Sequence, residues 1–332
     1  MYVGIHDFSV APLRKIRVIT DGFIGTSAAQ YLQAVGVREI KATQSMRPPK
    51  QLALFCGPKL YQPDAEKKLT ALRWYQQMID ALAPMKVTAI IKPYLWHNDL
   101  HDENIYVNPH NPGEITDIID WQACHISALF NHNPIPAFIA WEDGFGPEPE
   151  TLDLAPRPKL SGLSHEEISK AVHEYSIQNV FIGWQKLMHS KNPDMYKVVK
   201  FQKTALHGLI FLAHRMFEYG EVHFQSLLVE MQDTWAAELP AVTSNDVPFP
   251  FEFLETDTEH IGQDSDGAVA GIVLLMEMKE TMGDLWPDKG LIEHERYDEC
   301  KSALNEMKTQ AVEQLAETDE EKVEYERHWP FD

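Results

Sequence analysis

The chain has 332 residues, of which 44% are hydrophobic and 24% charged, a composition typical of a folded protein and unlike that of a disordered chain. Its 29 basic and 50 acidic residues give a net charge of −21, which disfavours non-specific nucleic-acid binding because phosphate contacts need clustered cations. The negative charge is concentrated near the C-terminus, where residues 252–332 carry 23 acids against 7 bases. That segment is a separate electrostatic region.

The cysteines and the apolar runs exclude two further classes of protein. Cys56, Cys124 and Cys300 are far apart and form no C-x-x-C motif, which disfavours a disulfide framework or a zinc ribbon. The apolar run 268–276 is shorter than the ~20 residues that span a bilayer. The N-terminus has no signal-peptide core, and the small basic cluster at 14–17 makes a poor mitochondrial presequence. We therefore predict no membrane span.

The first third of the chain predicts one strand and two helices. Residues 15–20 alternate like an exposed strand, and the Ser27-Ala-Ala-Gln30 capping box predicts the start of a helix. The four prolines of residues 46–63 predict a loop. A second helix is expected over about 64–83, where apolar residues recur at helical spacing up to Pro84.

The centre of the chain predicts a hairpin, a long loop and a capped helix. Residues 105–107 and 115–120 are strand-like, and the turn sequence 108–113 separates them. Residues 142–162 are rich in proline, glycine and acid, which predicts a loop. The second capping box, Ser164-His-Glu-Glu167, predicts a helix that Asn192-Pro193 ends.

The last third predicts four more helices, over about 195–219, 222–239, 257–282 and 293–317. The last of them carries an apolar stripe at intervals of three or four residues, formed by Tyr297, Cys300, Leu304, Met307, Ala311 and Leu315. We interpret the stripe as a face that docks onto the body of the protein. The alternative is a short coiled-coil helix that binds a partner.

The pattern that indicates chemistry is His97-x-Asp99-x-x-x-x-Asn104, followed by Asp120 in the apolar segment Ile-Ile-Asp-Trp. Phosphoryl transfer needs a carboxylate that accepts or orients the substrate hydroxyl, and oxygen ligands that hold Mg²⁺ against the nucleotide phosphates. A loop that leads into a hairpin can bring Asp99, Asn104 and Asp120 to one end of two strands. This arrangement is typical of a kinase catalytic loop with its metal-binding aspartate.

The residues around this pattern resemble a known family. Leu95–Ile105 and Ile118–Trp121 are similar to the aminoglycoside phosphotransferase and choline kinase-like family. Other segments are similar to a fungal branch, the altered inheritance of mitochondria protein nine-like phosphotransferases; they are residues 55–58, 121–125, 131–134, 208–217 and 326–332. The similarity extends from about residue 27 to the C-terminus.

The resemblance implies ATP- and Mg²⁺-dependent phosphoryl transfer to a small hydroxylated substrate. It implies a mitochondrial location, the cytoplasm being the alternative. Asp99 matches the family's catalytic aspartate, and His97 matches the histidine that steadies the loop. Asn104 and Asp120 match the magnesium ligands. His101 matches a frequent family residue to which we assign no role.

The family's N-terminal lobe, a five-stranded sheet with a phosphate-covering loop and a Lys–Glu ion pair, has no counterpart in the pattern. Only 96 residues precede His97, Gly22–Gly25 lacks the G-x-G-x-x-G spacing, and Lys41 lies on a predicted helix. We therefore expect an α+β, mostly helical fold: a protein kinase-like C-lobe with a short catalytic hairpin, truncated so that the N-lobe is largely absent and ATP binding and activity are weak. The expected division is an N-terminal remnant (1–26), the C-lobe (27–250) and an acidic helical extension (251–332).

Two other functions fit parts of the sequence. The missing lobe and the acidic tail suit a non-catalytic kinase-like scaffold with a protein partner. The H-x-x-x-H spacing of His97 and His101 suits a zinc hydrolase if both lie on a helix, which Pro93 and the strand-like neighbours disfavour.

Several residues that could carry chemistry have structural interpretations. We expect Trp96 and Trp121 to pack the catalytic loop and Cys124 to be a buried structural cysteine. His207 and His214, seven residues apart on an apolar helix, are expected to be core or capping histidines.

Overall fold

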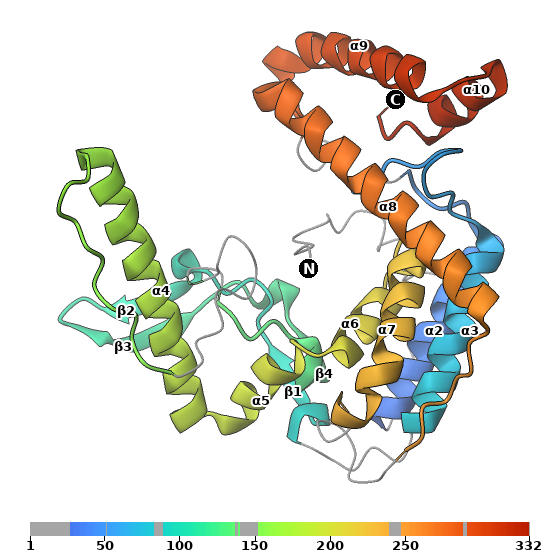
Figure 1. Cartoon of the computed structure of the whole chain (residues 1–332). Helices are drawn as coiled ribbons and strands as arrows, with labels where there is room; N and C mark the ends of the chain where they lie inside the picture. The colour runs from blue at the N-terminus through green and yellow to red at the C-terminus, as the bar shows by residue number, and fades with distance from the viewer. Residues whose placement is uncertain are drawn as a thin grey trace. The chain divides into compact units, whose positions relative to one another are not determined.

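The computed structural model describes residues 27–50, 52–82, 89–136, 139, 152–238, 247–287 and 291–331. It is mostly helical with two small antiparallel sheets, which confirms the α+β, mostly helical class (Figure 1). The described residues form two compact units: the first unit contains 89–204, and the second unit contains 27–82 and 205–331. The strand predicted at 15–20 lies outside the described residues.

The first unit is built from two pairs of strands and two helices. Strands β1 (Pro93–Trp96) and β4 (His125–Ala128) pair with each other, as do β2 (Ile105–Asn108) and β3 (Asn111–Ile118). Single 3₁₀ turns lie between β1 and β2 (η2, Asp102–Asn104) and between β3 and β4 (η3, Trp121–Ala123). Two more precede β1 (η1, Ala89–Ile91) and follow β4 (η4, Leu129–Asn131). Helices α4 (His165–Lys191) and α5 (Pro193–Phe201) complete the unit.

The predicted hairpin is present as β2 and β3, with a tighter turn than the sequence indicates. Ile105 lies opposite Ile118, and Asn108 lies opposite Asn111, so the connection shrinks to residues 109 and 110. The pairing of β1 with β4 was not predicted, because it joins segments that are distant in the sequence and carry little strand pattern of their own.

The helix start predicted at Ser164 is confirmed. The Ser164 Oγ accepts a hydrogen bond from the Glu167 backbone N, and the Glu167 carboxylate accepts one from the Ser164 backbone N at 2.7 Å. These bonds hold the pKa of Glu167 below its usual value. Helix α4 then ends at Lys191, and Asn192 caps α5 through a bond from the Met195 backbone N. Ser164 and Asn192 each accept a hydrogen bond from a backbone N–H in the first turn of a helix, where no carbonyl of the helix can accept it.

The single helix predicted over 195–219 is wrong. The structure has α5 up to Phe201, a break, and then α6 (Ala205–Ala213). At the break the Thr204 Oγ1 donates to the Phe201 carbonyl at 2.6 Å, and the Gln202 Nε2 donates to the His132 carbonyl at 2.9 Å. Side-chain hydrogen bonds to backbone carbonyls compete with the backbone bonds of a helix. Here they coincide with the boundary between the two units, which lies between residues 204 and 205.

The second unit contains four helices that lie side by side: α2 (Ala28–Ser45), α3 (Ala65–Leu82), α6 and α7 (Glu221–Glu238) (Figure 1). Their buried side chains include Leu32, Leu72, Tyr75, Ile79, Leu209, Phe224 and Leu228. The Tyr75 hydroxyl donates to the Leu32 carbonyl at 3.0 Å, so this buried polar group is satisfied. Each fully buried apolar side chain contributes about 1.5–3 kcal/mol by leaving water.

The acidic C-terminal helices belong to the second unit by their contacts. Helix α8 (Glu255–Met282) packs on α7 and extends to α9 (Tyr297–Leu315) and α10 (Asp319–His328) (Figure 1). Part of the predicted apolar stripe joins a cluster that contains Phe55, Leu275 and Trp329. This packing supports the docking interpretation over a coiled coil. Helix α10 was not predicted, since its ten residues are almost all polar.

The two contact units are not bounded at residue 250, because 251–331 pack together with 27–82. The division into a C-lobe and an acidic extension is based on family resemblance and stays a prediction. Of the helices that the structure describes, none has both the length and the apolar character to cross a bilayer.

His214 is a core residue, as predicted, and it makes the second unit sensitive to acid. Its Nδ1 bonds to the Ile210 carbonyl at 2.8 Å, and its Nε2 lies 3.1 Å from the Tyr31 hydroxyl. Burial is the main cause that lowers the pKa of His214 to about 4, and burial lowers the pKa of His207 equally. The unfolded chain therefore binds more protons than the folded chain between pH ~6.5 and ~4.

We predict that the free energy of unfolding falls as the pH drops through this window. One histidine shifted by about 2.5 pH units accounts for a loss of about 3 kcal/mol. His214→Gln removes the titrating group, so urea unfolding at pH 7.5, 6, 5 and 4 should show a shallower loss than in the parent chain. The exposed His173→Gln is the control. Identical pH profiles for His214→Gln and the parent would contradict the prediction.

Candidate functional site

His97 directly follows β1 and bonds to the segment before Asp120. Its Nε2 donates to the Ile119 carbonyl at 2.7 Å, and only 9% of the residue is exposed. The ring of Trp121 meets the His97 ring edge-on at a centroid distance of 4.8 Å. The Trp121 Nε1 also donates to the Ile118 carbonyl at 2.8 Å. Trp121 therefore packs the loop, as predicted, and His97 holds the chain just before Asp120.

Asn104 connects the turn that carries Asp99 to the end of β3. Its Nδ2 donates to the Asp99 carbonyl at 2.8 Å and lies 3.1 Å from the His101 Nε2. Its backbone carbonyl accepts from the Ile119 backbone N at 3.1 Å. Asn104 is 6% exposed. Since these side-chain bonds are made by Nδ2, the amide oxygen Oδ1 is the atom suited to bind a cation.

Asp120 has a backbone conformation that distinguishes it from the other residues. Its φ of 63° and ψ of 49° lie in the left-handed region, and within the described ranges no other non-glycine residue has a positive φ. This conformation costs energy and is often found at functional sites. The preceding residue, Ile119, bonds to both His97 and Asn104. The two hydrogen bonds of Ile119, one through its carbonyl and one through its N–H, therefore fix the backbone that leads into Asp120.

The structure thus joins His97, Asn104 and the Asp99 backbone in one hydrogen-bonded assembly, and Asp120 follows Ile119, which is part of it. Asp99 is exposed, Asp120 is half-buried, and His97 and Asn104 are buried. The link that unites the assembly is Ile119, whose backbone bonds His97 through its carbonyl and Asn104 through its N–H. The roles of the four residues stay predictions.

The donor atoms of this assembly fit a hard cation better than zinc. An amide oxygen and a carboxylate are the ligand types that Mg²⁺ prefers, with nucleotide phosphates and waters as the others. His97 and His101 lie on a strand end and a turn, so they do not share a helix face. No group of three or more His, Cys, Asp or Glu side chains that could hold a metal occurs in the part of the chain that the structure describes. The zinc hydrolase alternative needed both histidines on one helix, and the structure places them otherwise.

His125 and His132 form a cluster where β1 pairs with β4. His132 is 1% exposed, its Nε2 lies 3.2 Å from the carbonyls of Tyr94 and Ser127, and its ring stacks on Trp96 at 5.1 Å. Burial is the main cause that lowers the pKa of His132, and His125 adds to it. Asn98 in turn hydrogen-bonds His125. Trp96 was expected to pack the catalytic loop, whereas its ring stacks on His132 next to β4. The cluster was not predicted, because its members meet only through the pairing of distant strands.

Cys124 is exposed, so the prediction of a buried structural cysteine is wrong. The residue ends the single turn η3, where its backbone N donates to the Trp121 carbonyl.

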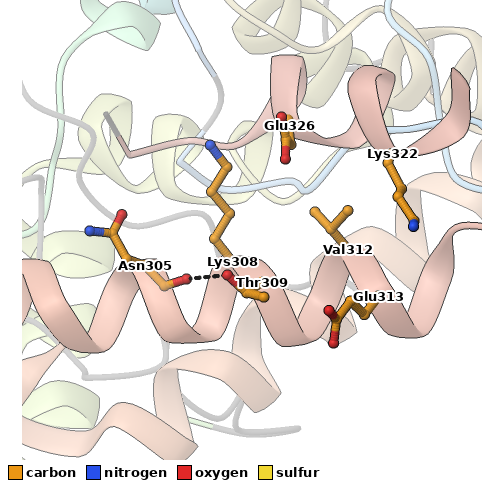
Figure 2. Close-up of a pocket in the computed structure, with 7 residues that line it drawn as sticks. All are labelled: Asn305, Lys308, Thr309, Val312, Glu313, Lys322 and Glu326. Carbon is orange, nitrogen blue, oxygen red and sulfur yellow. Dashed lines mark hydrogen bonds between the residues drawn. The ribbon is translucent and has the colours of Figure 1, made fainter. Parts of the chain in front are cut away.

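A groove of about 430 Å³ lies in the second unit, between α9 and α10 (Figure 2). It is lined by Asn305, Lys308, Thr309, Val312 and Glu313 of α9 and by Lys322 and Glu326 of α10. Each helix contributes both a lysine and a glutamate, so the groove has no excess of either charge. We interpret it as a solvated helix–helix groove.

Comparison of the chain with known proteins returned no matching family model, no matching curated protein and no matching solved structure. The relation to the phosphotransferase family therefore stays a proposal based on the residues of the loop.

Proposed function

We propose that the chain belongs to the ATP- and Mg²⁺-dependent phosphotransferases and acts on a hydroxyl group of a small molecule. The observation that supports this best is the pair of hydrogen bonds that the Ile119 backbone makes with His97 and Asn104. These bonds fix the backbone that leads into Asp120. The proposal includes the kinase-like C-lobe and, from the sequence resemblance, the mitochondrial setting.

Each residue of the assembly has a distinct role in this proposal. Asp99, exposed at the turn, accepts the proton of the substrate hydroxyl. The Oδ1 of Asn104 and the carboxylate of Asp120 bind Mg²⁺, which neutralises the charge on the transferring phosphoryl group. His97 acts as a positioning residue, since its bond to the Ile119 carbonyl fixes the backbone that precedes Asp120.

Nucleotide binding tests this proposal without requiring the substrate. We predict weak, Mg²⁺-dependent ATP binding, which Asp120→Ala lowers at least tenfold because a metal ligand is lost. Isothermal titration calorimetry with ATP in MgCl₂ and in EDTA measures it. Asp117→Ala is the matched control, since Asp117 is an exposed carboxylate on the same hairpin.

Two outcomes would contradict the proposal. One is the absence of binding at millimolar ATP in a folded chain, and the other is equal binding by Asp120→Ala and the parent. Either result would favour the alternative, a non-catalytic scaffold whose acidic tail binds a basic partner.

A further inference from the structure

A cavity of about 200 Å³ in the second unit lies where three segments meet. The loop after α2 contributes Arg47 and Lys50, the end of α10 contributes Arg327 and His328, and the start of α3 contributes Asp64 and Lys68. The volume exceeds the ~30 Å³ that one water occupies in the liquid. It is small beside the ~300–1,000 Å³ typical of drug-sized ligands. The cavity therefore suits a small ion or a small polar molecule.

The rim of the cavity is cationic in a chain whose net charge is −21. Arg47, Lys50 and Arg327 are exposed at its mouth. Arg327 forms an ion pair with Glu324 at 3.3 Å, and most of the Arg327 side chain stays open to solvent. The lining thus combines Arg47 and Lys50 of one loop with Arg327 of α10. Guanidinium and ammonium groups are those that proteins use to bind phosphate and carboxylate.

Polar atoms that are buried from solvent line part of the cavity. The Thr43 Oγ1 is buried and has no hydrogen-bond partner in the described part of the chain. An unmet buried hydroxyl costs about 1–3 kcal/mol, so a polar occupant of the cavity would recover energy. The Lys68 ammonium of the lining is already bonded to Glu221 at 2.7 Å.

Two acidic residues, Asp64 and Glu218, also line the cavity. Asp64 accepts a bond from the Glu66 backbone N at the start of α3, which directs its carboxylate to the helix. Burial is the main cause that raises the pKa of Glu218, while Arg215 and Lys68 lower it. Burial also raises the pKa of the Cys56 thiol to about 12, which makes Cys56 an inert wall and excludes a thiolate nucleophile.

We propose that this cavity binds a small anion, a phosphate or carboxylate group, between Arg47 and Arg327 with the Thr43 hydroxyl as a further donor. All the residues involved lie in the second unit, whereas the catalytic loop lies in the first. The proposal is therefore independent of the phosphotransferase assignment.

Equilibrium dialysis of the full chain with radiolabelled inorganic phosphate tests the proposal, with the ionic strength held constant by NaCl because surface charges are screened by salt. We expect saturable binding of about one equivalent. The double variant Arg47→Ala/Arg327→Ala should weaken it at least tenfold, and Thr43→Val several-fold. Competition with acetate distinguishes a carboxylate site from a phosphate site.

The matched control is Arg73→Ala, because Arg73 is an exposed arginine on α3 that contacts Glu66 outside the cavity. Circular dichroism confirms that each variant is folded. Asp99→Asn should bind phosphate like the parent, which separates this site from the catalytic loop. The proposal is overturned if neither anion binds saturably, or if Arg47→Ala/Arg327→Ala binds phosphate as well as Arg73→Ala does.

Discussion

Gly271→Ala is expected to destabilise the second unit by about 3 kcal/mol, the upper part of the range for overpacking a filled interior. A Cβ at this position of α8 would lie 2.1 Å from the Phe55 carbonyl oxygen and 2.9 Å from the Leu54 Cδ1. The Phe55 backbone N also donates to the Gly271 carbonyl at 3.3 Å. Since the nearest atom belongs to the backbone, no side-chain rotation can relieve the contact, and α8 must move away.

Gly262→Ala is the matched control on the same helix, because a Cβ there meets nothing within 4 Å. Alanine is favoured over glycine in an exposed helix interior by about 1 kcal/mol, so this variant should be neutral or slightly more stable. Urea unfolding followed by circular dichroism measures both. A Gly271→Ala variant as stable as Gly262→Ala would show that α8 does not pack on residues 54 and 55 this closely.

Lys68→Met should destabilise the second unit by about 3–5 kcal/mol, the usual cost of removing one partner of a buried ion pair. The Lys68 Nζ donates to the Glu221 Oε2 at 2.7 Å and to the Met216 carbonyl at 3.0 Å, and both side chains are at most 3% exposed. The other carboxylate oxygen of Glu221 accepts from the Tyr61 hydroxyl at 3.0 Å. Without the Lys68 ammonium, the buried Glu221 carboxylate would keep the neutral Tyr61 hydroxyl as its hydrogen-bond donor.

A double-mutant cycle distinguishes the ion pair from simple loss of packing. Lys68→Met combined with Glu221→Gln should lose less free energy of unfolding than the sum of the two single variants, because no unpaired charge remains buried. The control is Lys197→Met, which breaks the solvent-exposed pair with Asp194 and should change stability by less than about 1 kcal/mol. Strict additivity in the cycle would contradict the prediction.

Local patterns in the sequence determined much of this protein. The capping residues Ser27 and Ser164, the stop at Asn192 and the hairpin that follows Asn104 were predictable, because each depends on hydrogen bonds between residues close in the chain. The same holds for the candidate site. The spacing of His97, Asp99 and Asn104 places them in one loop, and the hairpin register brings Asp120 to it.

Only the tertiary structure decided the features that depend on contacts between distant segments. The pairing of β1 with β4 needs two weak strands to meet, and the end of α5 needs Gln202 to bond to the His132 carbonyl. The left-handed backbone of Asp120 is set by the bonds of Ile119, and the cationic cavity needs Arg47 and Arg327 from opposite ends of the chain. Sequence periodicity reports which face of an element is apolar, whereas the energy of a long-range pair depends on a partner that periodicity does not identify.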